Sequence, residues 1–291
     1  MKEIEEFLKY LKIIKKHSEY TLISYQKDLL ELYEFKNDLL HFNEKDRDGY
    51  LEYLYKRGFS RNSVSRKLSS IRSFYHYLEE EGYVWNNYFK EVRNPKRSQS
   101  LPKYVRDSDL ERMFLVFDKT TSLGQRNALI LEMLYATGVR VSELVNIRIK
   151  DINRYDHNIR IMGKGRKMRQ VFYGSYCEDV MNLYLRDGYL ELNSKNSDYL
   201  FLNKNGRQLS SRYVRVIIDD AVRKCQIDYH ISPHTLRHTF ATDLLNAGAD
   251  LMSVKELLGH SSINTTSIYT HVTTEQLRKV YDFAHPRSKE S

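Results

Sequence analysis

Cysteine is scarce in this chain, and long apolar runs are missing. Cys177 and Cys225 are the two cysteines among 291 residues. They are too few for a disulfide framework or a zinc ribbon, and they fit a reducing cytosol. No apolar run approaches the roughly 20 residues of a membrane span, and the acidic residues 1–6 lack the apolar core of a signal peptide. These absences exclude a disulfide-rich secreted domain and a membrane protein, and they predict a cytoplasmic one.

Proline is also scarce, and its positions divide the chain. Two of the four prolines, Pro95 and Pro102, fall in one short polar and basic segment. Because proline ends helices and favours extended backbone, residues 95–103 are predicted to link a domain of residues 1–94 to a domain of residues 104–291. Lys96 and Arg97 in this linker either follow a phosphate backbone or are simply solvated.

Acidic residues are outnumbered by basic ones. Lysine and arginine total 47 against 38 aspartates and glutamates, which gives a net charge of +9 and a pI near 9.2. This balance favours a polyanionic partner, with nucleic acid first and an acidic membrane surface second. Hydrophobic residues make up 41% of the chain, which is enough for a packed core, so wholesale disorder is not expected.

The predicted N-terminal domain is helical. Residues 3–16 are predicted to form one helix, and Ser18, Asn43 and Asn62 are candidate N-caps of three more, the last ending near Gly82. One face of this last helix collects polar and basic side chains that would suit a DNA major groove, although a solvated charged face is the alternative. Its members are Arg61, Arg66, Lys67, Ser70, Arg72 and Ser73.

The predicted C-terminal domain is mixed. Residues 107–119 and 122–136 have helical periodicity, and Gly138 ends the second helix. Residues 159–162 and 168–173 alternate like strands around a basic Gly-Lys-Gly turn, which predicts a β-hairpin. A further short strand and several helices are expected at 199–202 and at about 210–225, 235–247, 250–258, 264–271 and 274–284. The predicted fold class is mainly α with a small β-sheet (α+β).

Six residues of this second domain form a set suited to a phosphoryl group in transfer. Phosphodiester cleavage by a protein nucleophile needs donors for the nonbridging oxygens, a proton for the leaving oxygen and the nucleophile itself. Guanidinium groups suit the first task because they stay charged and can meet a phosphate with two parallel hydrogen bonds. A lysine between two glycines suits the second, and a tyrosine assisted by nearby cations suits the third. The candidates are Arg140, Lys164, His234, Arg237, His260 and Tyr269.

Two features beside these candidates leave alternatives open. Glu143, three residues after Arg140, either orients that guanidinium or is an ordinary surface charge. His234 and His238 are one helical turn apart, a spacing that zinc sites use, but no third Cys, Asp or Glu ligand stands out. We therefore expect no metal, and we expect His238 to be a packed helix residue.

The motifs around the six candidates resemble those of the tyrosine site-specific recombinases, most closely the Xer group. Gly163-Lys164-Gly165 is one of five motifs that stand in the family's order. The other four read Ala-Thr-Gly-Val-Arg-Val-Ser-Glu-Leu at 136–144, Ser-Pro-His-Thr-Leu-Arg-His-Thr-Phe-Ala-Thr at 232–242, Leu-Leu-Gly-His-Ser at 257–261 and Ile-Tyr-Thr-His-Val at 268–272. The likeness covers residues 1–285, although in the N-terminal part it rests on length and helix count.

The resemblance implies a reaction and a role for each residue. Tyr269 would attack the scissile phosphate, giving a 3′-phosphotyrosine and a free 5′-hydroxyl. Because the covalent link conserves the phosphoester energy, neither ATP, metal nor another cofactor is required. Arg140, Arg237 and His260 would stabilise the phosphate, and Lys164 would be the general acid. His234 would assist proton transfer, and Glu143 would support Arg140.

The resemblance also implies an assembly on DNA. A helical core-binding domain and a mixed catalytic domain would clamp double-stranded DNA at a short palindrome-like site. Four protomers, either identical or shared with a second recombinase, would exchange strands between two duplexes through a Holliday junction. The helix near 274–284 would pack into a neighbour, and an accessory regulatory protein and a nucleoid-associated location are further expectations.

The chain begins directly with the core-binding pattern, without an arm-binding domain ahead of it. This favours chromosome-dimer resolution over integration. The alternatives are the integrase of a mobile element, a relaxing topoisomerase and, from another class, a DNA-binding regulator with a relic active site.

Overall fold

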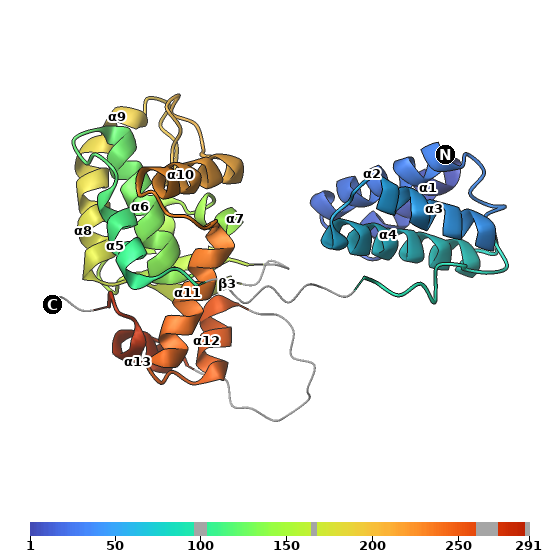
Figure 1. Ribbon diagram of the computed structural model, residues 1–291. Helices are drawn as coiled ribbons and strands as arrows, with labels where there is room; N and C mark the ends of the chain where they lie inside the picture. Colours follow the sequence, from blue (N-terminus) through green and yellow to red (C-terminus); the bar gives the residue numbers. More distant parts are fainter. Residues whose placement is uncertain (96–103, 164–167, 260–272, 289–291) are drawn as a thin grey trace. The chain divides into compact units, whose positions relative to one another are not determined.

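The computed structural model describes residues 1–95, 104–163, 168–259 and 273–288 (Figure 1). By its internal contacts the chain divides into two units, Met1–Ser100 and Leu101–Ser291, and each is described by itself. Helices dominate both units, and the one named sheet of the described residues has three short strands. The predicted fold class, mainly α with a small β-sheet, is confirmed. None of the described helices combines the length and the apolarity that crossing a membrane requires.

Four helices make up the N-terminal unit: α1 (Lys2–Ile13), α2 (Glu19–Phe35), α3 (Glu44–Lys56) and α4 (Arg61–Glu80). The predicted caps Ser18 and Asn43 are confirmed, because the side chain of each accepts a hydrogen bond from a backbone N–H of the first turn. The predicted cap Asn62 is wrong. Ser60 caps α4 instead, and Asn62 lies inside the first turn.

Aromatic side chains fill the core of this unit. Phe7 lies edge-on to Phe74 with ring centroids 5.4 Å apart, and Tyr75 stacks on Phe89 at the same separation. The hydroxyl of Tyr75 is buried and donates to the carbonyl of Leu39 at 2.9 Å. Tyr50, Tyr75 and Tyr77 are all buried and serve as packing residues of this unit.

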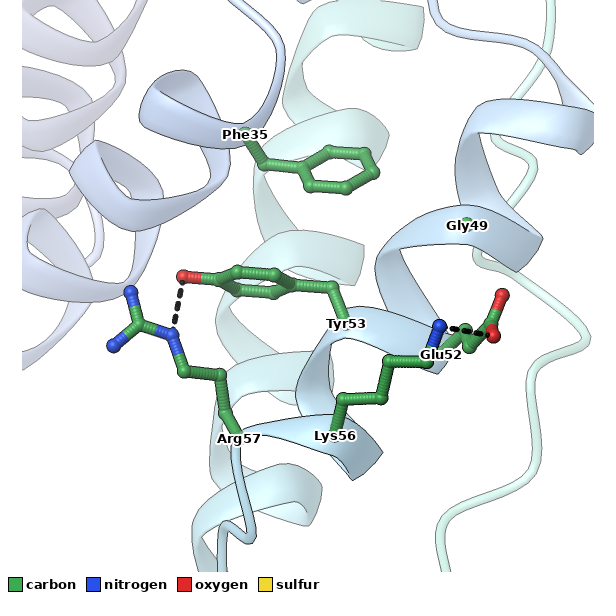
Figure 2. Close-up of a pocket in the computed structure, with 6 residues that line it drawn as sticks. All are labelled: Phe35, Gly49, Glu52, Tyr53, Lys56 and Arg57. Carbon is green, nitrogen blue, oxygen red and sulfur yellow. Dashed lines mark hydrogen bonds and ion pairs between the residues drawn. The ribbon is translucent and has the colours of Figure 1, made fainter.

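A shallow pocket of about 440 Å³ opens beside α3 in the same unit. Figure 2 shows the rings of Phe35 and Tyr53 in this pocket, with two cations at its edge. Both cations are already engaged. Arg57 Nε donates to the Tyr53 hydroxyl at 3.1 Å, and Lys56 pairs with Glu52 at 2.7 Å. We assign this pocket no ligand.

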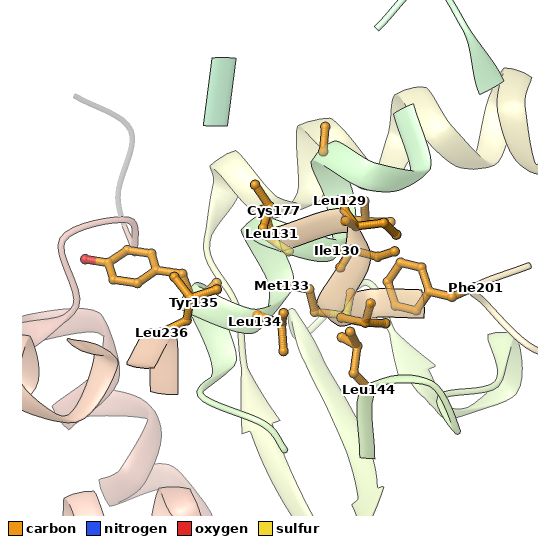
Figure 3. Close-up of a cluster of buried hydrophobic side chains, with 14 of the residues drawn as sticks. Leu129, Ile130, Leu131, Met133, Leu134, Tyr135, Leu144, Cys177, Phe201 and Leu236 are labelled. Carbon is orange, nitrogen blue, oxygen red and sulfur yellow. The ribbon is translucent and has the colours of Figure 1, made fainter. Parts of the chain in front are cut away.

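The C-terminal unit is built around α6 (Ser122–Thr137), which is buried along nearly its whole length. Figure 3 shows its apolar residues among side chains from several other segments, including Leu144, Cys177, Phe201 and Leu236. Its predicted end is confirmed, because Gly138 adopts a left-handed conformation with φ of 59°. A Cβ at Gly138 would lie 2.4 Å from the ring of Phe240, so a larger residue is excluded there. On either side of α6 along the chain lie α5 (Asp107–Leu115) and α7 (Val141–Leu144).

The sheet follows the short helix η1 (Ile149–Asp151). It has strands β1 (Ile152–Asn153), β2 (Asn158–Met162) and β3 (Met168–Phe172), antiparallel and in that order. The predicted hairpin is thus confirmed, while its tip, residues 164–167, lies outside the described residues. The strand expected at 199–202 is wrong, since Tyr199 and Leu202 form only isolated bridges, to Arg148 and Gln208.

Helices complete the C-terminal unit. Residues 175–192 form three helical segments that the sequence did not indicate: α8 (Ser175–Leu183), the π-helical η3 (Tyr184–Gly188) and α9 (Tyr189–Leu192). The remaining helices are α10 (Ser211–Lys224), α11 (Pro233–Asn246), α12 (Leu251–Leu258) and α13 (Thr274–Ala284). The helix expected at 264–271 lies outside the described residues.

The last helix, α13, packs on its own unit. Its buried residues Leu277, Tyr281 and Ala284 join a cluster with Phe240 and Leu244 of α11 and with residues of α12 and β3. Phe283 lies on the opposite side and is exposed. The apolar side of α13 therefore packs against α11 in the single chain.

Candidate active site

The structure describes part of the expected site. Four of the expected site residues are described: Arg140, Glu143, His234 and Arg237. The other expected residues lie outside the described residues, namely Lys164, His260, Tyr269 and the linker residues Lys96 and Arg97.

Arg140 is fixed by the residues on either side of it. Gly138 turns the chain after α6, Val139 is fully buried, and Arg140 stands at the N-terminus of α7. Glu143 accepts from the backbone N–H of Arg140 at 2.8 Å and from its Nη1 at 3.0 Å. Of the two interpretations left open for Glu143, the structure shows the orienting contact, and the carboxylate is buried rather than on the surface.

Arg237 is the second arginine, and it is nearly buried on α11. Its Nη1 donates to the carbonyl of Gly138 at 2.5 Å, and its Nη2 donates to that of Leu258 at 2.6 Å. Burial, reinforced by the charge of Arg140, lowers the pKa of Arg237 to about 10. The charge of a buried guanidinium beside a second cation is stabilised when an anion binds next to it. A phosphate-binding site requires this property.

A third arginine, Arg169 on β3, was not foreseen. Its Nη1 and Nη2 donate to the two carboxylate oxygens of Glu143 at 3.0 and 2.8 Å. The sequence carried one signal for it. Arg169 stands opposite Ile161 and two residues before the buried Val171, so strand alternation turns this cation towards the interior.

The three arginines meet at the C-terminal end of α12. Their guanidinium groups donate to three successive carbonyls: Arg169 to Leu257 at 3.2 Å, Arg237 to Leu258 at 2.6 Å and Arg140 to Gly259 at 3.3 Å. The last carbonyls of a helix have no partner within the helix and carry partial negative charge. This helix end therefore gathers the cations, and each arginine that has further N–H groups can offer them to a ligand.

The histidines of α11 are both accessible. Ser232 caps the helix and Pro233 occupies its first position, so His234 stands in the first turn, three residues before Arg237. His238 is exposed, which corrects the expectation that it is a packed residue. Across the described ranges, no group of three or more His, Cys, Asp or Glu side chains is arranged to hold a metal ion.

The DNA-facing surface expected on α4 needs correction. Ser70 and Lys67 are buried, with Ser70 Oγ donating to Asp28 at 3.1 Å and Lys67 Nζ to Glu31 at 2.9 Å. Arg66 also pairs with Asp28. Lys67 and Ser70 therefore belong to an internal network with α2 and cannot form an open contact face, whereas Arg66 joins this network from an exposed position.

The other members of that set differ in accessibility. Arg61, at the start of α4, is exposed, and Ser73 is half-buried. Arg72 is half-buried, with its guanidinium bonded to Leu68 and Asn94. Because α4 buries residues on more than one side, its polar positions did not mark an outer face. Arg61 and Arg66 are the members of the set that are exposed, and Arg66 is also paired with Asp28.

A basic groove that the sequence did not indicate adjoins the candidate site. It has a volume of about 680 Å³ and is lined by Glu143, by the hairpin strands and by the segment around η1. Its cations are Arg148, Lys150 and Arg160. Arg160 is exposed between two buried isoleucines of β2, and this alternation is the signal that marks it.

Known proteins share both units of this chain. The model of the phage integrase family matches residues 103–276, and that of the phage integrase N-terminal SAM-like domain matches residues 4–82. The chain belongs to the phage integrase family and is a Xer-type tyrosine recombinase, an enzyme that transfers DNA strands.

Its relatives include two proteins named tyrosine recombinase XerC. The one from Oceanobacillus iheyensis is 44% identical, over 98% of this chain and 96% of the relative. The one from Staphylococcus aureus is also 44% identical, over 98% of this chain and 97% of the relative. The expected resemblance to the Xer group and the expected enzyme class are confirmed.

Solved structures show the same fold. The recombinase XerH bound to a palindromic difH substrate, in a post-cleavage complex, is 25% identical over 96% of this chain and 83% of that chain, with a TM-score of 0.73. The recombinase XerA is 28% identical over 99% of this chain and all of that chain, with a TM-score of 0.51. A lambda integrase fragment bound to a core site, 16% identical over 92% of this chain and 98% of that chain, shares the fold with a TM-score of 0.69.

Proposed function

We propose that this recombinase cuts and rejoins DNA at one short palindrome-like site, through a covalent phosphotyrosine formed on Tyr269. The observation that carries the proposal is the meeting of Arg140 and Arg237 at the C-terminal end of α12. This helix ends two residues before His260 in the sequence, and Tyr269 follows nine residues after His260. Two fixed guanidinium groups supply the preorganised donors that phosphoryl transfer needs.

The reaction proceeds in two balanced steps. The hydroxyl oxygen of Tyr269 attacks the phosphorus, the bond to the 5′ oxygen breaks, and Lys164 gives that oxygen a proton. His234 assists the transfer of the tyrosine proton, while Arg140, Arg237 and His260 stabilise the charge on the nonbridging oxygens. In the second step a 5′-hydroxyl attacks the phosphotyrosine and releases Tyr269. The phosphoester bond count is unchanged, so no ATP is consumed.

DNA contacts outside the reacting phosphate fall to exposed cations. Arg148, Lys150 and Arg160 line the groove beside Glu143, where they would follow the sugar–phosphate backbone and fix the register of the duplex. Arg61 serves the same purpose on the N-terminal unit. Lys96 and Arg97 of the linker remain candidates for a backbone contact.

The biological task we infer is the resolution of chromosome dimers by four protomers on two duplexes, through a Holliday junction. The XerC relatives and the XerH complex with its palindromic difH substrate support this inference. In such an assembly α13 would leave its own unit and place Leu277 and Tyr281 in the equivalent site of a neighbour. An accessory regulatory protein and a cytoplasmic, nucleoid-associated location complete the proposal.

Covalent capture tests the nucleophile and the site together. Sheared host DNA is incubated with wild type, with Tyr269→Phe and with Tyr155→Phe, a matched control at a tyrosine that is almost fully exposed. Detergent stops the reaction, and the DNA attached to protein is sequenced. We expect adducts at one short palindromic locus from wild type and Tyr155→Phe, and none from Tyr269→Phe, whose binding to the site should stay within a few-fold.

Other outcomes separate the alternatives. Adducts without sequence preference would indicate a topoisomerase, and adducts at two unlike sites would indicate an integrase. Adducts that persist in Tyr269→Phe would show that another residue attacks. Site binding without any adduct from wild type would indicate a DNA-binding regulator.

The general acid is tested separately. Lys164→Ala should cleave normal DNA slowly but recover on DNA with sulfur in place of the 5′ bridging oxygen, because a thiolate leaves without a proton. Failure of the sulfur substrate to restore the rate would exclude Lys164 from this role.

A further inference from the structure

Arg169 is a nearly buried arginine whose guanidinium binds Glu143, a residue of the candidate site. Its two terminal nitrogens donate to the two carboxylate oxygens of Glu143, at 3.0 and 2.8 Å. The same two oxygens accept from Nη1 and the backbone N–H of Arg140. One buried carboxylate therefore links Arg169 to Arg140.

We propose that Arg169 is a positioning residue for strand transfer: it holds Glu143 in one orientation and thereby sets the direction in which Arg140 offers its guanidinium to the scissile phosphate. The inference rests on the phosphate-binding role proposed for Arg140. It adds a residue that neither the motifs nor the reaction chemistry had assigned.

The shape of the guanidinium explains why this position needs arginine. Two parallel hydrogen bonds fix the plane of a carboxylate, whereas the point charge of lysine fixes only its distance. Without Arg169, Glu143 could turn towards Arg140 and accept from N–H groups that the phosphate needs. Arg169 thus neutralises Glu143 and leaves part of Arg140 free.

The charge state of Glu143 agrees with this arrangement. Burial alone would raise the pKa of its carboxyl, but hydrogen bonds from Arg169 and from the backbone and side chain of Arg140 hold the pKa below its ordinary value. Glu143 therefore stays ionised and able to hold both arginines. Arg169 carries the larger part of the side-chain contact, because it binds both oxygens through its side chain.

Gly259 provides an independent indication. It ends α12 in the left-handed conformation, with φ of 64°. A Cβ at this position would lie 3.0 to 3.2 Å from Cδ, Nε and Cζ of Arg169, which is closer than a side-chain contact normally allows. The backbone of Gly259 and the guanidinium of Arg169 therefore lie directly against each other.

Arg169 also fastens two segments that carry expected catalytic residues. Its Nε donates to the carbonyl of Leu257 at 3.2 Å, which ties β3 to the end of α12. Lys164 stands five residues before Arg169 on the same hairpin, and His260 follows α12 by two residues. One side chain thus connects the strand that follows the general acid, the carboxylate that holds Arg140 and the helix that precedes His260.

The test compares cleavage of normal DNA with cleavage of DNA that carries a methylphosphonate at the scissile position. Replacing one nonbridging oxygen by methyl removes the negative charge that Arg140 would meet, so a variant that fails through Arg140 should recover. The substrate is the duplex recovered by covalent capture, used under single-turnover conditions with Arg169→Ala, Arg169→Lys and Arg140→Ala. Arg154→Ala is the matched control, since it breaks a surface pair with Glu178.

We expect Arg169→Ala to cut normal DNA about 10- to 100-fold more slowly than wild type, which is less than the roughly 100- to 1000-fold loss of a direct donor. DNA affinity should change by less than about threefold. On methylphosphonate DNA the deficits of Arg169→Ala and Arg140→Ala relative to wild type should both shrink. Arg169→Lys should keep most of the deficit of Arg169→Ala although it keeps the charge, and Arg154→Ala should match wild type.

A double variant distinguishes an effect that acts through Glu143 from a general loss of structure. If Arg169 acts through Glu143, then Arg169→Ala combined with Glu143→Gln should cleave no more slowly than the worse single variant. Two results would overturn the inference and leave Arg169 a structural residue. One is a double variant in which the cleavage deficits of the two single variants multiply, and the other is an Arg169→Ala deficit that is the same on both substrates. An Arg140→Ala deficit that does not shrink on methylphosphonate DNA would instead overturn the proposed role of Arg140, and the inference with it.

Discussion

Asp28 and Lys67 form an ion pair in the interior of the N-terminal unit, with Lys67 Nζ 3.4 Å from Oδ1 of Asp28. The carboxylate is completely buried and also accepts from Ser70 Oγ at 3.1 Å. It joins α2 to α4, because Lys67 and Ser70 both lie on α4. Polar residues that would suit a DNA surface by composition are therefore part of the packing of this unit.

Removing Asp28 should destabilise the N-terminal unit without removing a DNA contact. Asp28→Ala leaves Lys67 buried with only Glu31 as its carboxylate partner, and breaking one side of a buried pair costs about 3 kcal/mol. Urea unfolding of the full chain, monitored by circular dichroism, should show the N-terminal unit unfolding at a lower urea concentration. Its free energy of unfolding should fall by about 3 kcal/mol. Arg61→Ala is the matched control, because this exposed cation should change stability by less than about 0.5 kcal/mol while weakening DNA binding. Equal stability of Asp28→Ala and wild type would contradict the structural role of the network.

The sequence predicted those parts of the fold that depend on local chemistry. Ser18, Asn43 and Gly138 mark helix ends through contacts within one turn, and the β2–β3 hairpin follows from alternation over five residues. The face of α4 could not be predicted in the same way. Whether Lys67 and Ser70 point outward depends on Asp28, which lies about forty residues earlier in the chain and was not recognised as buried.

The residues of the candidate site likewise divide into those that a local motif predicts and those that depend on tertiary contacts. Arg140 and Arg237 were found because each sits in a distinctive local motif, and Glu143 because it is one helical turn from Arg140. Arg169 was missed because its role depends on a contact with Glu143 across 26 positions and on a helix end 88 positions away. Motifs therefore indicated the groups that would touch phosphate, whereas the group that holds them required the tertiary structure.

Gly259→Ala should impair cleavage more than it impairs folding. The added methyl group meets Arg169 at about 3.0 Å, and the left-handed backbone costs alanine about 1 to 2 kcal/mol. Gly248→Ala is a matched control, since Gly248 has φ of 92° but nothing within 4 Å of an added Cβ. Both variants should therefore melt a few degrees lower, and only Gly259→Ala should also lose single-turnover cleavage, by about tenfold or more. Equal cleavage by the two variants would show that the contact with Arg169 does not matter.

The C-terminal unit should lose stability as the pH falls, through His285. This ring is buried against Tyr281, Tyr135 and Phe240, and its Nδ1 accepts from the backbone N–H of Arg287 at 3.1 Å. Burial lowers its pKa to about 3, whereas an unfolded histidine titrates near 6.5. The native state therefore binds fewer protons, so the stability it contributes is complete above about pH 6.5 and declines as the pH falls towards 3.

A variant isolates this contribution from other titrating groups. Between pH 7 and pH 5, wild type should lose about 2 kcal/mol more of its unfolding free energy than His285→Phe, which keeps an aromatic ring but has nothing to protonate. Buried Glu132 has a raised pKa because of its burial, and its effect of opposite sign is present in both proteins. Parallel losses in the two proteins would exclude His285 as the cause.

The segment after α13 should depend on the ion pair between Glu132 and Arg287. Arg287 Nε and Nη2 donate to the two oxygens of Glu132 at 2.5 and 2.9 Å, and the guanidinium lies 4.3 Å from the ring centroid of Phe114. Glu132 is 2% exposed on α6, so Arg287→Ala would leave a buried, uncompensated carboxylate. We expect a loss of about 3 to 5 kcal/mol of unfolding free energy, measured by urea denaturation at pH 7.

Replacing both partners, as in Glu132→Leu with Arg287→Met, should restore most of this stability, because an apolar pair of similar size carries no desolvation cost. If the double variant were as unstable as Arg287→Ala, the uncompensated carboxylate would not account for the loss, and the contact of the guanidinium with Phe114 would be what holds the segment.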